Sequence, residues 1–230
     1  MRTYTSLFAV ALAAVALAVQ DAPAQNTGDV PTVAVLDFTG LMLGDAGNSV
    51  AIGKAMSAML VTEFSGREGL RVLERQNLQD LLTEQRLALS GRVDESSAIE
   101  IGKLLGVQYI FVGAVVSMGN QLRVDIRATD VETSEVVSVL KKNDKPEQLL
   151  EVVVWIADEF SKKLDLTPPS GRPQAEPIPV RATIEFSRAV DFEDKGDAAK
   201  AMEHYQKALE VYPNHRDAQR ALARLRGGDV

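Results

Sequence analysis

The sequence predicts a mixed α/β (α+β) fold followed by a small all-α module. Three observations carry this prediction: apolar β-rich runs alternate with helix-spaced apolar segments, three strand-like segments follow one another across short turns, and residues 181–230 have helical periodicity throughout. An apolar fraction of 46% and a charged fraction of 25% are ordinary for a folded protein. The 230 residues leave room for one full domain and a smaller unit.

The predicted order of elements in the first domain, residues 25–166, is βαβααβββα. The expected strands are β-branched runs bounded by turn residues, and they cover residues 32–39, 70–73, 107–118, 122–128 and 135–141. The expected helices have apolar residues three and four apart, and they cover residues 48–64, 76–89, 96–105 and 146–164. Ser96 is the expected cap of the third helix and Pro146 the first residue of the fourth. Because short turns join the last three strands, we expect an antiparallel meander within one mixed sheet with packed helices.

Residues 1–24 have the pattern of a secretory signal peptide. Arg2 supplies a positive charge, and the apolar run 7–19 is shorter than the about 20 residues of a membrane-spanning helix. Ala22 and Ala24 are the small residues that precede a cleavage site, so the mature chain is expected to begin at Gln25. An uncleaved membrane anchor is the alternative. The pattern predicts export to the periplasm, with no transmembrane segment after cleavage.

Residues 167–180 hold five of the nine prolines and are expected to form a semi-rigid, extended linker. Beyond the linker, residues 181–230 place small and aromatic residues at the offsets of a tetratricopeptide (TPR) repeat. These residues are Ala189, Phe192, Gly196, Ala201, Tyr205, Ala208 and Pro213. Glu185 and Arg188 depart from the pattern, and a generic helical hairpin is the alternative. One repeat is below the about three that such stacks need, so it must pack on the first domain, on another copy or on a partner.

Two further groups of residues are candidates for a partner interface. Arg216, Arg220 and Arg224 lie four residues apart and form one basic stripe on the last helix, which either contacts an acidic partner or is solvated. On the helix 146–164, Val154 and Trp155 widen the apolar arc beyond what one face of a sheet requires. That arc is either buried within the fold or forms a subunit or partner interface, where Trp is favoured.

Composition and motifs argue against several classes of function. A formal charge of −7 disfavours nucleic acid as a partner, and the lack of cysteine excludes disulfides and thiolate metal sites. The two histidines, His204 and His215, both lie in the helical module, which excludes a His-based triad or metal site in the first domain. Residues 47–54 resemble a phosphate-binding loop, but the spacing is wrong and Ala55 has no hydroxyl. We therefore expect no enzyme, no cofactor and no metal.

Four segments resemble the curli-secretion (CsgG/HfaB-type) family. They are residues 33–38 (VAVLDF), 73–85 (LERQNLQDLLTEQ), 101–113 (IGKLLGVQYIFVG) and 127–136 (RATDVETSEV), in the family's order. The resemblance covers about residues 31–165. It implies a periplasmic α/β domain related to the N-terminal domain of TolB, with a role in export or assembly of surface fibres and adhesins. The curli channel of this family is a ring in the outer membrane.

The sequence departs from the channel members of the family in two ways. Only Gly119 and Asn120 separate two of the expected strands, and residues 141–146 form an equally short connection, whereas a membrane strand needs about 9–11 residues. The lipidated cysteine of the family is also missing. We therefore expect a non-catalytic periplasmic accessory or assembly protein that binds envelope proteins or peptides, or further copies of itself. The alternatives are an outer-membrane secretion channel subunit and a TolB-like or cell-wall-synthase regulator.

Overall fold

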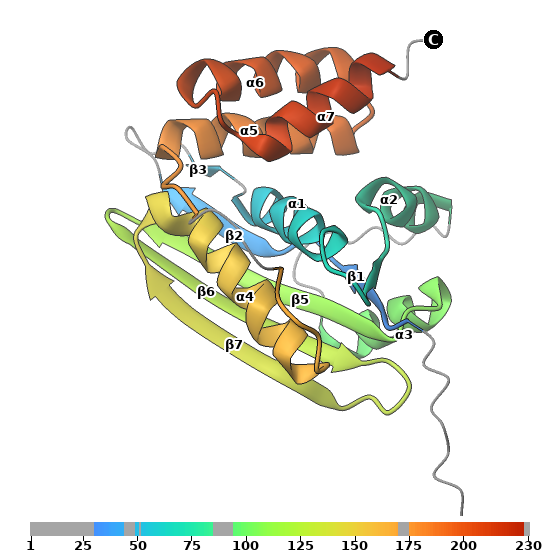
Figure 1. Cartoon of the computed structure of the whole chain (residues 1–230). Coiled ribbons are helices and arrows are strands. Elements are labelled where there is room, and N and C mark those ends of the chain that lie inside the picture. The colour runs from blue at the N-terminus through green and yellow to red at the C-terminus, as the bar shows by residue number, and fades with distance from the viewer. Residues whose placement is uncertain (1–29, 44–48, 51, 85–93, 170–174, 228–230) are drawn as a thin grey trace, which may run out of the picture.

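The computed structural model describes residues 30–43, 49–50, 52–84, 94–169 and 175–227 (Figure 1). The predicted cleavage residues Ala22, Ala24 and Gln25 lie outside these ranges. The described strands are β1 (Thr32–Val35), β2 (Thr39–Leu43), β3 (Ser49–Val50), β4 (Arg71–Val72), β5 (Tyr109–Met118), β6 (Gln121–Asp130) and β7 (Val136–Asp144). The described helices are α1 (Ile52–Ser65), α2 (Arg75–Glu84), α3 (Glu95–Leu105), the 3₁₀ turn η2 (Pro146–Gln148), α4 (Leu149–Lys163), α5 (Val180–Asp194), α6 (Ala198–Val211) and α7 (Arg216–Gly227). The predicted mixed α+β fold is confirmed.

Strand β5 is the centre of the sheet. It pairs in parallel with β1 and β2 along one edge and antiparallel with β6 along the other, and β6 pairs antiparallel with β7. The predicted meander of three strands is therefore confirmed. Along β6, Leu122, Val124 and Ile126 are buried while Arg123 and Arg127 are exposed, as the alternating pattern predicts.

The first predicted strand, residues 32–39, is instead two strands, and β3 adds a short antiparallel partner to the second. Val35 is paired with Phe111 of β5, and Thr39 is paired with Ala114. The chain therefore advances four residues from β1 to β2 where β5 advances only three. The extra residue interrupts the pairing as a bulge does. The sequence conceals the interruption because the apolar run continues through it, and Phe38 is buried on the irregular stretch.

The start of α3 also differs from the prediction. The cap is Asp94, not Ser96, because the Asp94 carboxylate accepts a hydrogen bond of 2.8 Å from the backbone N–H of Ser97. Both residue types are good caps, and Asp94 places Glu95 in the first turn, where the helix dipole favours a negative charge. In α2 the described helix runs to Glu84, and the rest of the predicted helix 76–89 lies outside the described residues.

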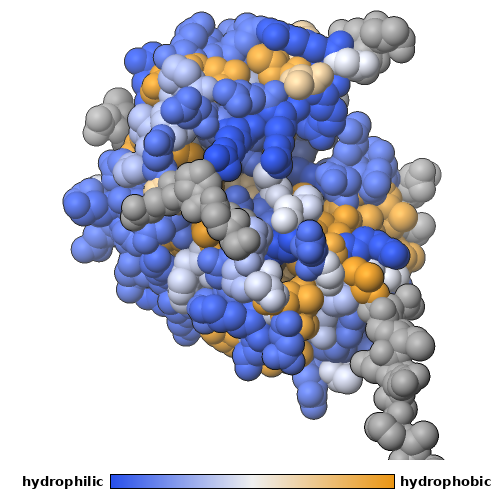
Figure 2. Space-filling model, in the orientation of Figure 1, coloured by the Kyte–Doolittle hydropathy of each residue, from blue (hydrophilic) through white to orange (hydrophobic). Residues whose placement is uncertain are grey.

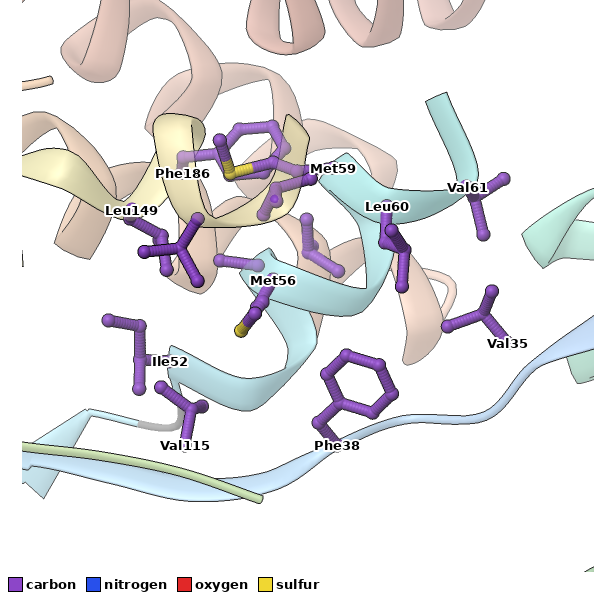
Figure 3. Close-up of a cluster of buried hydrophobic side chains, with 14 of the residues drawn as sticks. Val35, Phe38, Ile52, Met56, Met59, Leu60, Val61, Val115, Leu149 and Phe186 are labelled. Carbon is purple, nitrogen blue, oxygen red and sulfur yellow. The ribbon is translucent and has the colours of Figure 1, made fainter. Parts of the chain in front are cut away.

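Helix α1 lies at the centre of the main hydrophobic cluster. Figure 3 shows Met56 and Leu60 of α1 above Val35 and Val115 of the sheet and above Phe38, which lies between β1 and β2. Gly53 allows this close approach, because a Cβ atom there would lie 1.9 Å from the carbonyl oxygen of Phe38. Gly53 thus lies inside α1, within the predicted helix 48–64, and serves the packing of that helix.

Helices α5, α6 and α7, here called the helical segment, pack on the side of α1 that faces away from the sheet (Figure 1). Phe186 of α5 belongs to the same buried cluster as Met59 of α1, so one hydrophobic cluster runs through both parts of the chain. The end of the linker is also packed: Ile178 is buried, and its N–H donates to the carbonyl of Glu147 at 2.8 Å. The helical segment is too short to be stable alone, and it packs on the first domain of its own chain.

Candidate functional site

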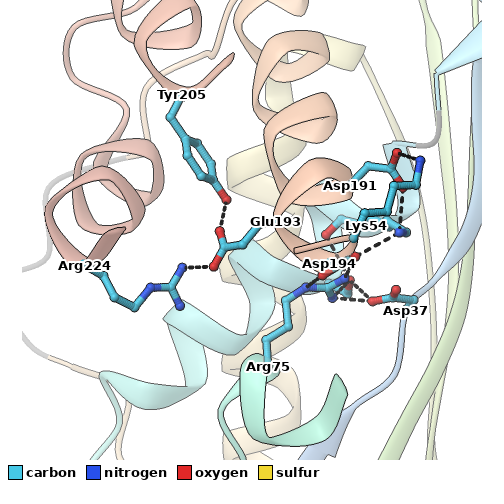
Figure 4. A network of polar contacts seen from close by, with 10 residues as sticks. Asp37, Lys54, Arg75, Asp191, Glu193, Asp194, Tyr205 and Arg224 are labelled. Atoms are coloured by element: carbon cyan, nitrogen blue, oxygen red, sulfur yellow. Dashed lines mark hydrogen bonds and ion pairs between the residues drawn. The ribbon is translucent and has the colours of Figure 1, made fainter. Parts of the chain in front are cut away.

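A network of charged side chains joins the helical segment to the rest of the protein (Figure 4). Asp194, near the end of α5, lies 2.7 Å from the guanidinium of Arg75 and 2.9 Å from Nζ of Lys54. Lys54 also contacts Asp191 at 2.8 Å, and Arg75 forms an ion pair with Asp37. The network thus connects α1, α2, α5 and the irregular stretch between β1 and β2.

Each charge in this network is compensated by another. Burial alone would lower the pKa of Arg75, but Asp37 and Asp194 outweigh it and raise the pKa. The pKa of Lys54 is likewise raised, because its bonds to Asp191 and Asp194 outweigh burial. Arg75 and Lys54 therefore stay charged near neutral pH, and their ion pairs hold the two parts of the protein together.

A second branch of polar contacts runs through Glu193 to the last two helices. Glu193 accepts a hydrogen bond of 2.7 Å from the hydroxyl of Tyr205 in α6, and it forms an ion pair with Arg224 in α7. Tyr205 is buried, and burial together with Glu193 raises the pKa of its hydroxyl. Arg224, one of the three arginines of the predicted basic stripe, is thus engaged within the fold.

The residues predicted from the TPR offsets lie at the contacts between α5 and α6. Ala189, Ala201 and Ala208 are fully buried, and the ring of Phe192 stacks on that of His204 at 5.2 Å. Gly196, with a φ of +75°, turns the chain between the two helices, and Pro213 is exposed just after α6. The assignment of a TPR repeat itself stays a prediction.

The two residues that depart from the TPR offsets form a local polar cluster. Glu185 contacts Arg188 at 2.8 Å and Nδ1 of His204 at 2.7 Å. A charged pair can therefore occupy positions where an apolar pair was expected, because His204 of the next helix supplies the partner for the carboxylate.

A cavity of about 490 Å³ lies where α1, α4, the linker and α7 meet, and we call it the linker cavity. Val154, Arg216 and Arg220, three of the predicted interface residues, line it. Val154 is more than 60 residues away from the two arginines in the sequence, so the sequence offered no reason to group them. Trp155 is not part of this group: it is half-buried, and Nζ of Lys142 on β7 lies 5.4 Å from its ring.

A second cavity of about 400 Å³ lies between α1, α2 and the helical segment. Arg75, Glu193, Tyr205 and Arg224 of the polar network line it, together with Arg220. Most of these polar groups already pair with one another. The face of the molecule over α7 and α4 is largely hydrophilic, with isolated hydrophobic side chains (Figure 2).

Two ionisable residues with shifted pKa values lie at the start of α7, the buried His215 and the partly exposed Asp217. His215 is 1% exposed, its ring packs on that of Phe186 at a centroid distance of 4.5 Å, and neither ring nitrogen has a hydrogen-bond partner. Burial lowers the pKa of His215 to about 4. Burial also raises the pKa of Asp217 to about 6; a hydrogen bond from Thr62 opposes this rise, and the charge of Glu63 adds to it. Neither residue was predicted to be special, because nothing in a single sequence reports burial beside a neighbour on another helix.

The outer face of the sheet carries apolar side chains that no described helix covers. Val116 is 51% exposed, Met118 64% and Val139 53%. On the same face, α2 and α3 cover only the other half of β5, where Ile110 is buried. This face is the part of the sheet that is available for contact with another molecule.

The described residues show no feature of a metal site or a helical membrane anchor. Across residues 30–227, the described side chains include no group of three or more His, Asp or Glu placed to hold a metal ion. None of the helices seen in the structure combines the length and the apolar character that crossing a membrane requires.

Comparison with known proteins gave structural and family matches. No curated protein matched the chain. The LpoB C-terminal domain from Salmonella enterica is 18% identical, with a TM-score of 0.41, over 50% of this chain and 83% of that one. TolB from Acinetobacter baumannii is 10% identical, with a TM-score of 0.40, over 60% of this chain and 29% of that one. PelC, a dodecamer from Paraburkholderia phytofirmans, is 14% identical, with a TM-score of 0.34, over 58% of this chain and 86% of that one.

The family match agrees with part of the resemblance seen in the sequence. It covers three of the four segments that carried the resemblance and ends before the fourth, residues 127–136. Its described part holds β1 to β5 and α1 to α3. Residues 13–123 of this chain thus match the family of the curli production assembly/transport component CsgG.

Proposed function

We propose that this chain is a non-catalytic accessory protein of the bacterial periplasm that acts through protein–protein contacts in the export or assembly of surface components. The match of residues 13–123 to the CsgG family carries this proposal. The predicted signal peptide supports the compartment. The exposed apolar side chains Val116, Met118 and Val139, on a part of the outer sheet face that no described helix covers, support a role in binding other proteins.

The architecture suggests how the two parts of the protein work together. The ion pairs of Asp194 with Lys54 and Arg75 hold the helical segment at one position on α1. A protein built in this way presents two separate surfaces, the outer face of the sheet and the surface around α7, in a fixed relation. We infer that the chain joins two envelope components, or a component and a second copy of itself.

Cell fractionation combined with a native mass measurement tests the proposal. We expect the protein in the periplasmic fraction without detergent, as a monomer or small oligomer. Photo-crosslinking from position 116 or 139 on the outer sheet face should capture envelope proteins, whereas position 203, on the exposed side of α6, serves as the control. A large ring released only by detergent would instead support the secretion-channel alternative, and turnover of an envelope substrate would contradict a non-catalytic role.

A further inference from the structure

Strand β7 forms an edge of the sheet, and one side of its backbone has no partner strand among the described residues (Figure 1). On its other side, β7 pairs with β6. The register between the two strands shifts near Ala128, which leaves residues 138–144 as a regular stretch without proline. A regular strand edge with free N–H and C=O groups is a template to which another strand can add.

The hydrogen bonds around the end of β6 show which amides of β7 are free. Asp130 donates its N–H to the carbonyl of Glu135, toward β7, whereas the next residue, Val131, donates to Gln108, toward β5. Because this direction alternates along an antiparallel strand, the even-numbered residues of β6 bond to β7. Those residues lie opposite the even-numbered residues of β7 between 138 and 144. The N–H and C=O groups that point away from the sheet therefore belong to Val139, Lys141 and Asn143.

A second copy of this chain fits the free edge when two β7 strands pair antiparallel about Leu140. In this register Leu140 lies opposite Leu140 of the second copy, and Val139 lies opposite Lys141 in a hydrogen-bonded pair. Each Lys141 keeps Asp125 of its own chain as a cross-strand neighbour. An axis through Lys141 would instead place two lysines directly opposite each other, which is destabilising. The side chains therefore favour the register about Leu140.

Charges beyond the two ends of the regular stretch complement each other in the same register. Lys145 follows Leu140 by five residues and Glu135 precedes it by five, so Lys145 of each copy comes beside Glu135 of the other. Both side chains are exposed, and neither forms an ion pair with another described residue. Because a two-fold interface makes every contact twice, the dimer gains two ion pairs that the single chain lacks.

We propose that the chain forms a two-fold symmetric dimer in which the β7 strands of two copies pair antiparallel about Leu140 and join the two sheets into one. Main-chain hydrogen bonds supply the attraction, and the ion pairs between Lys145 and Glu135 fix the register. The outer faces of both sheets then lie on the same side, so Val116 and Met118 of both copies are presented together. The dimer goes beyond the proposed function, which concerns the outer face and not the edge of the sheet.

Cysteine crosslinking tests the register, because the chain itself has no cysteine. Leu140→Cys places two thiols opposite each other in a non-hydrogen-bonded pair, where the Cα atoms lie about 4.5 Å apart, within the range of a disulfide. Mild oxidation of the purified mature protein should give a disulfide-linked dimer. Asn143→Cys is the matched control: the position is more exposed, but it lies opposite residue 137 of the second copy, so no disulfide should form.

Sedimentation equilibrium tests the main-chain pairing, and the parent protein should show a monomer–dimer equilibrium. Lys141→Pro removes an N–H that the single chain does not use, and the dimer loses it twice. The dissociation constant should therefore rise at least about tenfold. Lys141→Ala keeps the N–H and, as the matched control, should dimerise like the parent. Lys145→Glu or Glu135→Lys alone should also weaken the dimer, and the double variant should restore it.

Three results would overturn the inference: a parent protein that stays monomeric at every concentration, equal crosslinking of the two cysteine variants, or equal dissociation constants for Lys141→Pro and Lys141→Ala. Thermal melts verify that the variants fold, and the charge variants, at exposed positions, keep the test decisive if the proline variant does not. If the parent is monomeric while crosslinks from position 116 still capture envelope proteins, the proposed function stands and only the dimer inference fails.

Discussion

The carboxylate of Asp194, near the end of α5, lies 2.7 Å from the guanidinium of Arg75, the first residue of α2. The side chains are 11% and 13% exposed, so water screens their attraction only weakly. Asp194 also holds Lys54 of α1. One carboxylate thus joins three helices that are far apart in the sequence, and it fixes where the helical segment sits.

Substituting Asn for Asp194 should therefore loosen the helical segment. The variant leaves two partly exposed cations, Lys54 and Arg75, with fewer partners, although Asp37 and Asp191 remain. We expect a loss of about 2–3 kcal/mol in the free energy of unfolding, less than for a fully buried pair that loses its only partner. Urea unfolding of the variant and the parent protein measures this loss in the free energy of unfolding. Lys207→Gln, which breaks an exposed pair with Glu203, is the control and should change stability by less than about 0.5 kcal/mol. Equal effects would contradict the role of the network.

A methyl group at position 53 should disturb the contact between α1 and the sheet. The Cβ atom of Gly53→Ala would meet the Phe38 carbonyl at 1.9 Å, and backbone cannot yield as a flexible side chain does. We expect about 3 kcal/mol of destabilisation by chemical denaturation. In Gly66→Ala the nearest atom lies 3.7 Å from the new Cβ, so that variant should be as stable as the parent. An unchanged Gly53→Ala protein would show that α1 does not approach the strand this closely.

Replacing His215 by Phe should stabilise the protein by about 1 kcal/mol. The ring keeps its contact with Phe186, while two buried nitrogens without hydrogen-bond partners are removed. The matched control is His204→Phe, which removes the hydrogen bond to Glu185 and should destabilise the protein. Thermal melts of both variants at neutral pH give the comparison, and a destabilised His215→Phe protein would indicate that the nitrogens do have partners.

His215 and Asp217 should give opposite dependences of stability on pH. The imidazole titrates near pH 6.5 when unfolded and near 4 when folded, so the unfolded state binds more protons between these values. The contribution of His215 therefore rises with pH across that window, by roughly 3 kcal/mol in total. Asp217 titrates near 3.8 when unfolded and near 6 when folded, so its contribution falls as the pH rises from about 4 to 6.

Single variants separate the two contributions. Asp217→Asn leaves His215 in place, so its stability should rise with pH between about 4 and 6.5, whereas that of His215→Phe should fall over the same window. In the parent protein the two trends largely oppose each other. Urea unfolding at several pH values between these limits measures the slopes. Parallel slopes in the two variants would show that one of these groups is not buried as described.

The sequence by itself determined the local elements, because their signals lie between near neighbours. The alternation of Leu122, Val124 and Ile126 specified a strand with one buried face, and the Gly119–Asn120 turn specified its antiparallel partner. Alanines at helical spacing likewise marked the contact between α5 and α6. A continuous apolar run could not reveal the bulge between β1 and β2, and two adjacent good capping residues could not tell which one begins α3.

Only the tertiary structure decided how these elements meet. Val154 and Arg220 were suspected separately, on different helices, and the fold places both in the linker cavity. The sequence gives no sign that Asp194 neutralises Lys54 and Arg75, since charged residues on helix surfaces look alike whether solvated or paired. Burial and charge pairing are properties of the packed chain: they arise from residues that sequence separates and that only the folded arrangement brings together.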